Sequence, residues 1–120
     1  MNITAVATWT GEALLVAAAL FQAALAAGVP WGAAAYGGRA ARPDGSLPPQ
    51  YRLSSAVTVV LLATAGWALH AAVGPVVWGL AALFLLNTAA NLAARHPVER
   101  WGMGLGTLAL AGCCVLVAWS

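Results

Sequence analysis

Ionisable side chains within otherwise apolar stretches are the first candidates for chemistry in this chain, and they are Glu12 and His70. Such groups are costly in lipid and are functional candidates by default. Glu12 has two interpretations. It is a protonatable carboxylate that binds a cation or relays protons, or it is an acid in the first turn of a helix capped by Thr8 or Thr10. His70 either forms a pH-sensitive couple with Glu12 or lies near the lipid headgroups as an interfacial histidine.

Amide side chains form a second polar group, and they are Gln22, Asn87 and Asn91. Asn87 and Asn91 are four residues apart, so they share one face of a helix. Hydrogen bonding between helices is the simpler interpretation of all three amides. The sharper hypothesis joins them to Glu12 and His70 as a polar path through a helical bundle.

The composition indicates that lipid is the solvent for the elements that position these residues. Hydrophobic residues make up 62% of the 120 residues, charged residues 7%, and the mean hydropathy is +0.87. A soluble domain carries about 25% charged residues. About 20 apolar residues span a bilayer as a helix. The sequence therefore predicts one all-α domain over residues 1–120, an integral membrane bundle of four transmembrane helices, at about residues 8–27, 53–73, 76–94 and 101–119.

Two connections define the expected topology. Gly74 and Pro75 separate the second and third helices, and a Gly-Pro pair signals a turn that a helix does not cross. We expect a tight hairpin there, with its two helices as neighbours. The long loop 28–52 holds most of the prolines and glycines outside the helices. Residues 31–36 within it are expected to form either a short interfacial helix or part of a flexible loop.

All positive charge lies in two connections that share one face of the membrane. The five arginines are Arg39, Arg42, Arg52, Arg95 and Arg100. The positive-inside rule makes that face cytoplasmic, so both termini are expected outside. Tryptophans and tyrosines near both ends of the predicted helices agree with this layout. We expect a multi-pass protein of the bacterial cytoplasmic (inner) membrane, N-out and C-out, whose arginines contact anionic lipid headgroups or a protein partner.

Small residues form a stripe on the fourth predicted helix, at Gly102, Gly106, Ala109 and Cys113. Such stripes let helix backbones approach closely. They favour packing within the bundle or, alternatively, a homo-oligomer. The adjacent Cys113 and Cys114 are expected to pack in the bundle rather than to carry redox or metal chemistry.

The turn before that helix is explained by helix dipoles. Arg95 lies at the carbonyl end of the third helix and Glu99 at the amide end of the fourth, and both charges complement the helix ends. A contact between Arg95 and Glu99 is expected there, without a catalytic role.

Several short motifs are distributed along the chain: Pro30-Trp31-Gly32, Gly37-Gly38, Leu47-Pro48, Arg52 with Ser55, and residues 91–95 followed by Glu99-Arg100. This pattern resembles that of a group of uncharacterised small four-helix integral membrane proteins of bacteria. The resemblance covers most of the chain. It implies the four-helix fold and implies no activity.

Three functional classes remain open. The first is a small transporter or channel-like bundle for an ion, a proton or a small solute. The second is an accessory or assembly subunit of a larger membrane complex. The third, which we favour least, is a membrane enzyme acting on a lipid-soluble substrate with Glu12 and His70 as acid and base. Phosphate loops, zinc motifs and serine elbows are absent from the sequence. We expect no cofactor, no metal site and no nucleic-acid partner.

Overall fold

Helices dominate the computed structural model, which describes residues 2–120. The main helices are α1 (Ile3–Ala27), α2 (Pro49–His70), α3 (Gly74–Leu92) and α4 (Gly104–Trp119). The segment η3 (Val98–Met103) has π-helical geometry and leads into α4, while η1 (Gly32–Ala34) and η2 (Tyr36–Gly38) are single 3₁₀ turns. Four segments, 19 to 25 residues long, are long and apolar enough to cross a membrane. The all-α class is confirmed, and the chain is a multi-pass membrane protein.

Two helices begin earlier than their hydropathy predicts. The helix α1 begins at Ile3 instead of Thr8, because the side chain of Asn2 accepts a hydrogen bond of 2.8 Å from the Ala5 N–H and caps the helix. The helix α2 begins at Pro49, since a proline in the first turn needs no N–H partner. The connection between α1 and α2 is therefore 28–48 rather than 28–52. Glu12 consequently lies in the interior of α1, so its expected place in a first turn is wrong.

Arginines close the carboxyl ends of two helices. Gly28 ends α1 with φ +96°, and Arg52 Nε donates to the Ala26 carbonyl at 3.0 Å. Similarly, Arg100 Nε donates to the Ala94 carbonyl at 3.0 Å, just beyond α3. Carbonyl groups at the carboxyl end of a helix lack intrahelical hydrogen-bond partners and carry partial negative charge. A guanidinium group supplies both a hydrogen-bond donor and a positive charge.

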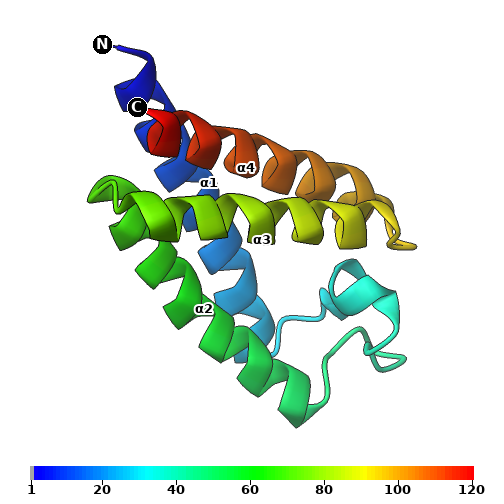
Figure 1. Cartoon of the computed structure of the whole chain (residues 1–120). Helices are drawn as coiled ribbons and strands as arrows, with labels where there is room; N and C mark the ends of the chain where they lie inside the picture. The colour runs from blue at the N-terminus through cyan, green and yellow to red at the C-terminus, as the bar shows by residue number, and fades with distance from the viewer. Residues whose placement is uncertain (1) are drawn as a thin grey trace.

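The two ends of the bundle differ in what they contain. We call the end with loop 28–48 and turn 93–97 the arginine end, and the end with both termini and turn 71–73 the terminal end. The termini meet there, with Thr4 Oγ1 and Ser120 Oγ hydrogen-bonded at 2.6 Å. Figure 1 shows the N- and C-termini side by side at this end.

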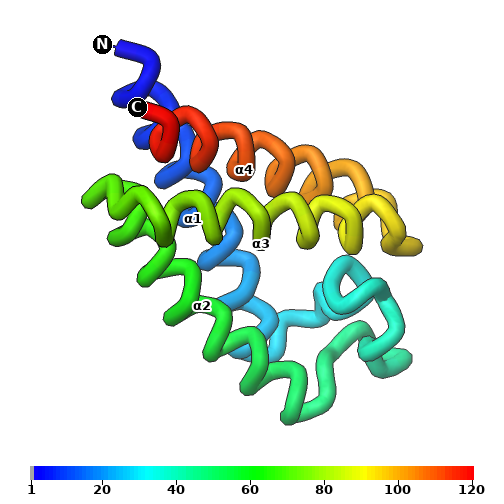
Figure 2. Tube along the Cα trace, in the orientation of Figure 1, coloured from blue at the N-terminus to red at the C-terminus, as the bar shows by residue number. Residues whose placement is uncertain are grey.

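The four helices pack as two pairs. The helix α1 packs along α2, α3 packs along α4, and α1 also contacts α4. The helices α2 and α3 meet near turn 71–73 and then diverge, as the ribbon and the tube both show (Figures 1 and 2). A short turn joins them as expected, but it comprises residues 71–73, and Gly74 and Pro75 form the start of α3. The expectation that the two helices are packed neighbours along their length is wrong. Each helix finds a closer partner in α1 or α4.

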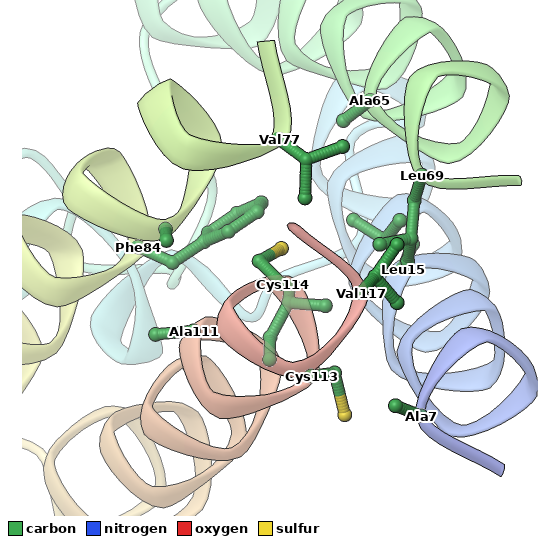
Figure 3. Packing of buried hydrophobic residues seen from close by; sticks show 12 residues of the cluster. Ala7, Leu15, Ala65, Leu69, Val77, Phe84, Ala111, Cys113, Cys114 and Val117 are labelled. Atoms are coloured by element: carbon green, nitrogen blue, oxygen red, sulfur yellow. The ribbon is translucent and has the colours of Figure 1, made fainter. Parts of the chain in front are cut away.

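The main hydrophobic core fills the terminal half of the bundle. All four helices contribute to it, and it extends from the terminal end to Leu15, Phe84 and Leu110 near the middle of the bundle. Figure 3 shows Cys114 among Val77, Phe84 and Val117, while the Cys113 side chain points the other way, toward Ala7. Both thiols are free and buried. The cysteines pack in the core, as expected.

Gly11 allows the closest approach in this core. A Cβ atom at Gly11 would lie 2.6 Å from Leu69 Cδ2 and 3.4 Å from Cys113 Cβ. Because Leu69 is fully buried, its side chain has little room to move away. Gly11 therefore lets α1 approach α2 and α4 together.

We predict that Gly11→Ala lowers the free energy of unfolding in detergent by about 1–3 kcal/mol through overpacking. The matched control is Gly112→Ala on α4, where a Cβ atom meets nothing within 4 Å. That change should raise stability by about 0.5–1 kcal/mol, because alanine favours helix over glycine. Chemical denaturation measures both. Equal effects at the two sites would contradict the assigned packing.

Candidate functional site

A cavity of about 640 Å³ lies between the two helix pairs. Ligand pockets in proteins have volumes of about 300–1,000 Å³. All four helices contribute to its wall, together with the loop and η3. Most of the wall is apolar, from residues such as Leu14, Ala18, Phe21 and Leu62. The polar groups are Gln22, Tyr36, Thr58, Asn87, Asn91, Glu99 and Thr107.

The cavity is closed toward the terminal end by the main core. Phe84 and Leu110 belong both to that core and to the cavity wall. Beyond them, the core continues to Val77 and Val117 with side chains that are almost fully buried. The cavity therefore occupies the middle and the arginine end of the bundle, and it does not continue to the terminal end.

Residues of loop 28–48 cross the arginine end and border the cavity. Leu47 and Ala35 pack with Leu25 of α1 in a small second core. Tyr36 has a φ of +52°, which is uncommon for a residue other than glycine. Its hydroxyl group is hydrogen-bonded to Ser55 Oγ at 3.0 Å and donates to the Tyr51 carbonyl at 3.3 Å. The loop is therefore anchored to α2.

A second anchor ties the loop to the other helix pair. The Gly37 N–H donates to Glu99 Oε1 at 3.1 Å and to Oε2 at 3.3 Å. Glu99 is only 6% exposed. Its carboxylate contacts this amide and not Arg95, so the expected contact between Arg95 and Glu99 is not formed. Glu99 was not predicted as a cavity residue, because Arg95 and Arg100 on either side of it indicated a polar turn. The signal was its position within the apolar segment 98–119.

The structure brings the three predicted amides together around one cavity. Gln22 comes from α1, and Asn87 and Asn91 come from α3. Asn91 Nδ2 donates to Thr107 Oγ1 at 3.4 Å, and Thr107 is also hydrogen-bonded to Thr88 at 2.9 Å, so these contacts join α3 to α4. Gln22 Oε1 is buried and has no hydrogen-bond partner. Within residues 2–120, Asn91 alone of the three amides forms a hydrogen bond between helices, while Gln22 and Asn87 line the cavity without one.

Glu12 and His70 lie elsewhere, in a surface groove of about 590 Å³ between α1 and α2. Within residues 2–120, Leu62 alone borders both this groove and the cavity, so the described residues form no continuous path from Glu12 to the amides. His70 is exposed and makes an edge contact with Trp9, with ring centroids 5.9 Å apart. Glu12 Oε1 is buried without a hydrogen-bond partner, and Oε2 lies over Gly66.

The small-residue stripe of α4 faces mostly open space. A Cβ atom at Gly102 or Gly106 would meet nothing within 4 Å, and both glycines border the cavity. Ala109 is exposed, and Cys113 lies in the core. Close helix approach occurs instead at Gly11, at Gly66 over Glu12, and at Gly104 against Leu92.

The charged groups of the arginine end lie mainly at the surface. All five arginines are exposed. Ser46 donates two hydrogen bonds to Asp44, and these hold the pKa of that carboxyl below its ordinary value. Within residues 2–120, no cluster of three His, Cys, Asp or Glu side chains has the arrangement of a metal site.

We predict that Tyr36→Phe loosens the loop, because it removes the hydrogen bond to Ser55 and keeps the ring contact with Tyr51. The expected loss of stability is about 1 kcal/mol, with faster amide hydrogen exchange over residues 32–47. Tyr51→Phe is the control, since the Tyr51 hydroxyl has no hydrogen-bond partner in the described part of the chain. Equal exchange rates in the two variants would show that the Tyr36 hydroxyl does not anchor the loop.

We also predict that Glu12→Met stabilises the protein in detergent. Methionine fills a similar volume and removes a buried carboxylate oxygen that has no partner. An unsatisfied buried polar group costs about 1–3 kcal/mol, and the variant should recover part of it. Thermal unfolding provides the measurement. A lower Tm would mean that the Glu12 carboxylate stabilises the groove through its charge.

The site that emerges is an apolar cavity with a buried carboxylate and an unpaired amide oxygen, covered at the arginine end by an anchored loop. Its side chains offer hydrogen-bond donors and acceptors and one carboxyl group. Comparisons with protein-family models, with curated proteins and with solved structures find no match for this chain.

Proposed function

We propose that this protein is a small membrane carrier that binds an amphipathic solute in the cavity between its two helix pairs. One observation carries the proposal. A cavity large enough for a small organic molecule is lined by all four spanning helices and combines an apolar wall with amide, hydroxyl and carboxylate groups. Ligand sites typically have this combination of a mostly apolar wall and few polar groups that fix orientation.

The distribution of packing favours a carrier over an open pore. A pore needs a polar route along its whole length, whereas here the terminal half of the bundle is filled by the core around Leu69, Val77 and Cys114. A carrier instead exposes its site to one side at a time. The turn at Ala72, which has a φ of +54°, is the short connection about which the α1–α2 pair would move relative to the α3–α4 pair.

The orientation is part of the proposal. The five arginines all lie at one end of the bundle, in loop 28–48, the first turn of α2, turn 93–97 and η3. The positive-inside rule assigns that end to the cytoplasmic side of a bacterial inner membrane. In this orientation the exposed guanidinium groups contact anionic headgroups. The cavity then lies toward the cytoplasmic side, under loop 28–48.

A transport assay with a cavity-filling variant tests the proposal. Gly106 borders the cavity and has free space for a side chain, so Gly106→Leu fills the site without a backbone clash. Gly112→Leu on the same helix is the control, because Gly112 does not border the cavity. The probes are three dansyl amides with the same pentyl chain, ending in an ammonium, a methyl or a carboxylate group.

Proteoliposomes with the wild-type protein should take up at least one probe faster than empty liposomes. Gly112→Leu should retain this uptake, while Gly106→Leu should reduce it by about tenfold or more, which corresponds to about 1.4 kcal/mol of lost binding. Uptake that equals that of empty liposomes for all three probes would overturn the carrier. Equal uptake by the two leucine variants would remove the cavity from the mechanism.

A further inference from the structure

We infer that the cavity selects amphipathic molecules that carry a primary ammonium group, with Glu99 and Gln22 as the residues that receive it. This inference rests on the proposed function, because it names the chemical class of the solute. It follows from which polar groups in the cavity already have partners and which do not.

The hydroxyl donors of the wall and the Asn91 amide are engaged within the protein, whereas the amide groups of Gln22 and Asn87 form no hydrogen bond within residues 2–120. Tyr36 is hydrogen-bonded to Ser55 and Tyr51, Thr58 Oγ1 donates to the Ser54 carbonyl, and Asn91 Nδ2 donates to Thr107. Thr107 Oγ1 in turn donates to backbone carbonyls of its own helix. These groups have little capacity left to donate to an anionic or carbonyl ligand.

Two buried acceptors of the wall have capacity left, on Glu99 and Gln22. The Glu99 carboxylate has four lone-pair sites and receives one backbone N–H, that of Gly37. Gln22 Oε1 is buried and receives no hydrogen bond. Both residues border the same cavity. A ligand that donates several hydrogen bonds is therefore the complement of this wall, and a primary ammonium group donates three.

The charge of the site supports the same class of ligand. A buried carboxylate is costly unless a cation compensates it, and within residues 2–120 no arginine forms an ion pair with Glu99. Arg100, its chain neighbour, is turned to the Ala94 carbonyl. The nearby His96 accepts from the Val98 N–H through Nδ1 and is fixed within the turn. A ligand cation would supply the missing charge.

The apolar part of the wall determines the chemical character of the rest of the ligand. Phe21, Leu14, Phe84 and Leu110 extend the cavity from the polar groups toward the core. The helices α2 and α3, which both contribute to the wall, diverge from turn 71–73 onward (Figure 2). An amine with an alkyl or aromatic tail fits this arrangement. Two sources share that chemistry, a free amphipathic amine and the ammonium headgroup of an ethanolamine phospholipid.

Equilibrium binding in nanodiscs of phosphatidylcholine, followed by dansyl fluorescence, tests the inference apart from transport. The ammonium probe should bind about tenfold to a hundredfold more tightly than the methyl probe, the range given by charge-assisted hydrogen bonds. Glu99→Gln keeps an acceptor for the Gly37 N–H and removes the charge. It should abolish the preference for the ammonium probe by weakening the binding of that probe about tenfold to a hundredfold.

Glu12→Gln is the matched control, because it neutralises an acid in the separate groove and should leave the preference intact. Hydrogen exchange of the Gly37 amide verifies that Glu99→Gln preserves the loop. Replacing part of the phosphatidylcholine by phosphatidylethanolamine should weaken binding of the ammonium probe if the lipid headgroup occupies the site. Unchanged binding in that lipid assigns the site to a free amine.

Two results would overturn the inference. In the first, the ammonium and methyl probes bind with equal affinity, and Gly106→Leu prevents the binding of both. The cavity would then be a binding site without selectivity for amines. Failure of every probe to bind would remove both the binding site and its selectivity. Selective amine binding without uptake would overturn the carrier alone.

Discussion

The hydrogen bond from the Gly37 N–H to the Glu99 carboxylate joins the two halves of this molecule at the arginine end. One partner lies in the loop that follows α1 and is anchored to α2 through Tyr36, and the other begins the segment that leads into α4. The helix pairs α1–α2 and α3–α4 are closely packed at the terminal end. At the arginine end, the divergence of α2 and α3 leaves the cavity between them. Without this contact, the loop would keep its anchors on α1 and α2 and lose its connection to η3.

The unequal packing of the two ends has a simple physical origin. In lipid, helix association depends on close packing of small side chains and on hydrogen bonds, because burying apolar surface between helices gains little over contact with lipid tails. Alanines, glycines and cysteines of the terminal half allow such packing around Gly11 and Cys114. Toward the arginine end, the threonines and Asn91 tie α3 to α4 through side-chain hydrogen bonds. Gly102 and Gly106 there leave space unfilled, so the same residue type closes one half of the bundle and opens the other.

The sequence predicted the four spans well, because hydropathy over about 20 residues measures the physical requirement for crossing a bilayer. Helix starts were predicted less well, since the Asn2 cap and the proline at Pro49 are local effects that hydropathy does not detect. The amides Gln22, Asn87 and Asn91 were grouped from the sequence by their expected depth, and all three border one cavity. Their common cavity was not predictable, because helices rich in alanine have no strongly apolar face that sets their rotation. Glu99 was missed for a different reason: its partner, Gly37, lies 62 residues away in the chain, and no local pattern relates the two.

Accessibility of the cavity wall is the most direct test of this structure in a membrane. The test compares two single cysteines, Ala18→Cys and Leu20→Cys, in a variant without Cys113 and Cys114. Ala18 borders the cavity, whereas Leu20 is 67% exposed on α1 and borders neither the cavity nor the groove. The two positions lie at nearly equal depth in the membrane. A small water-soluble thiol reagent needs water and thiolate to react. The cavity predicts that Ala18→Cys reacts faster than Leu20→Cys, and that adding Gly106→Leu removes the difference. Equal and slow reaction at both positions would contradict an accessible cavity between the two helix pairs.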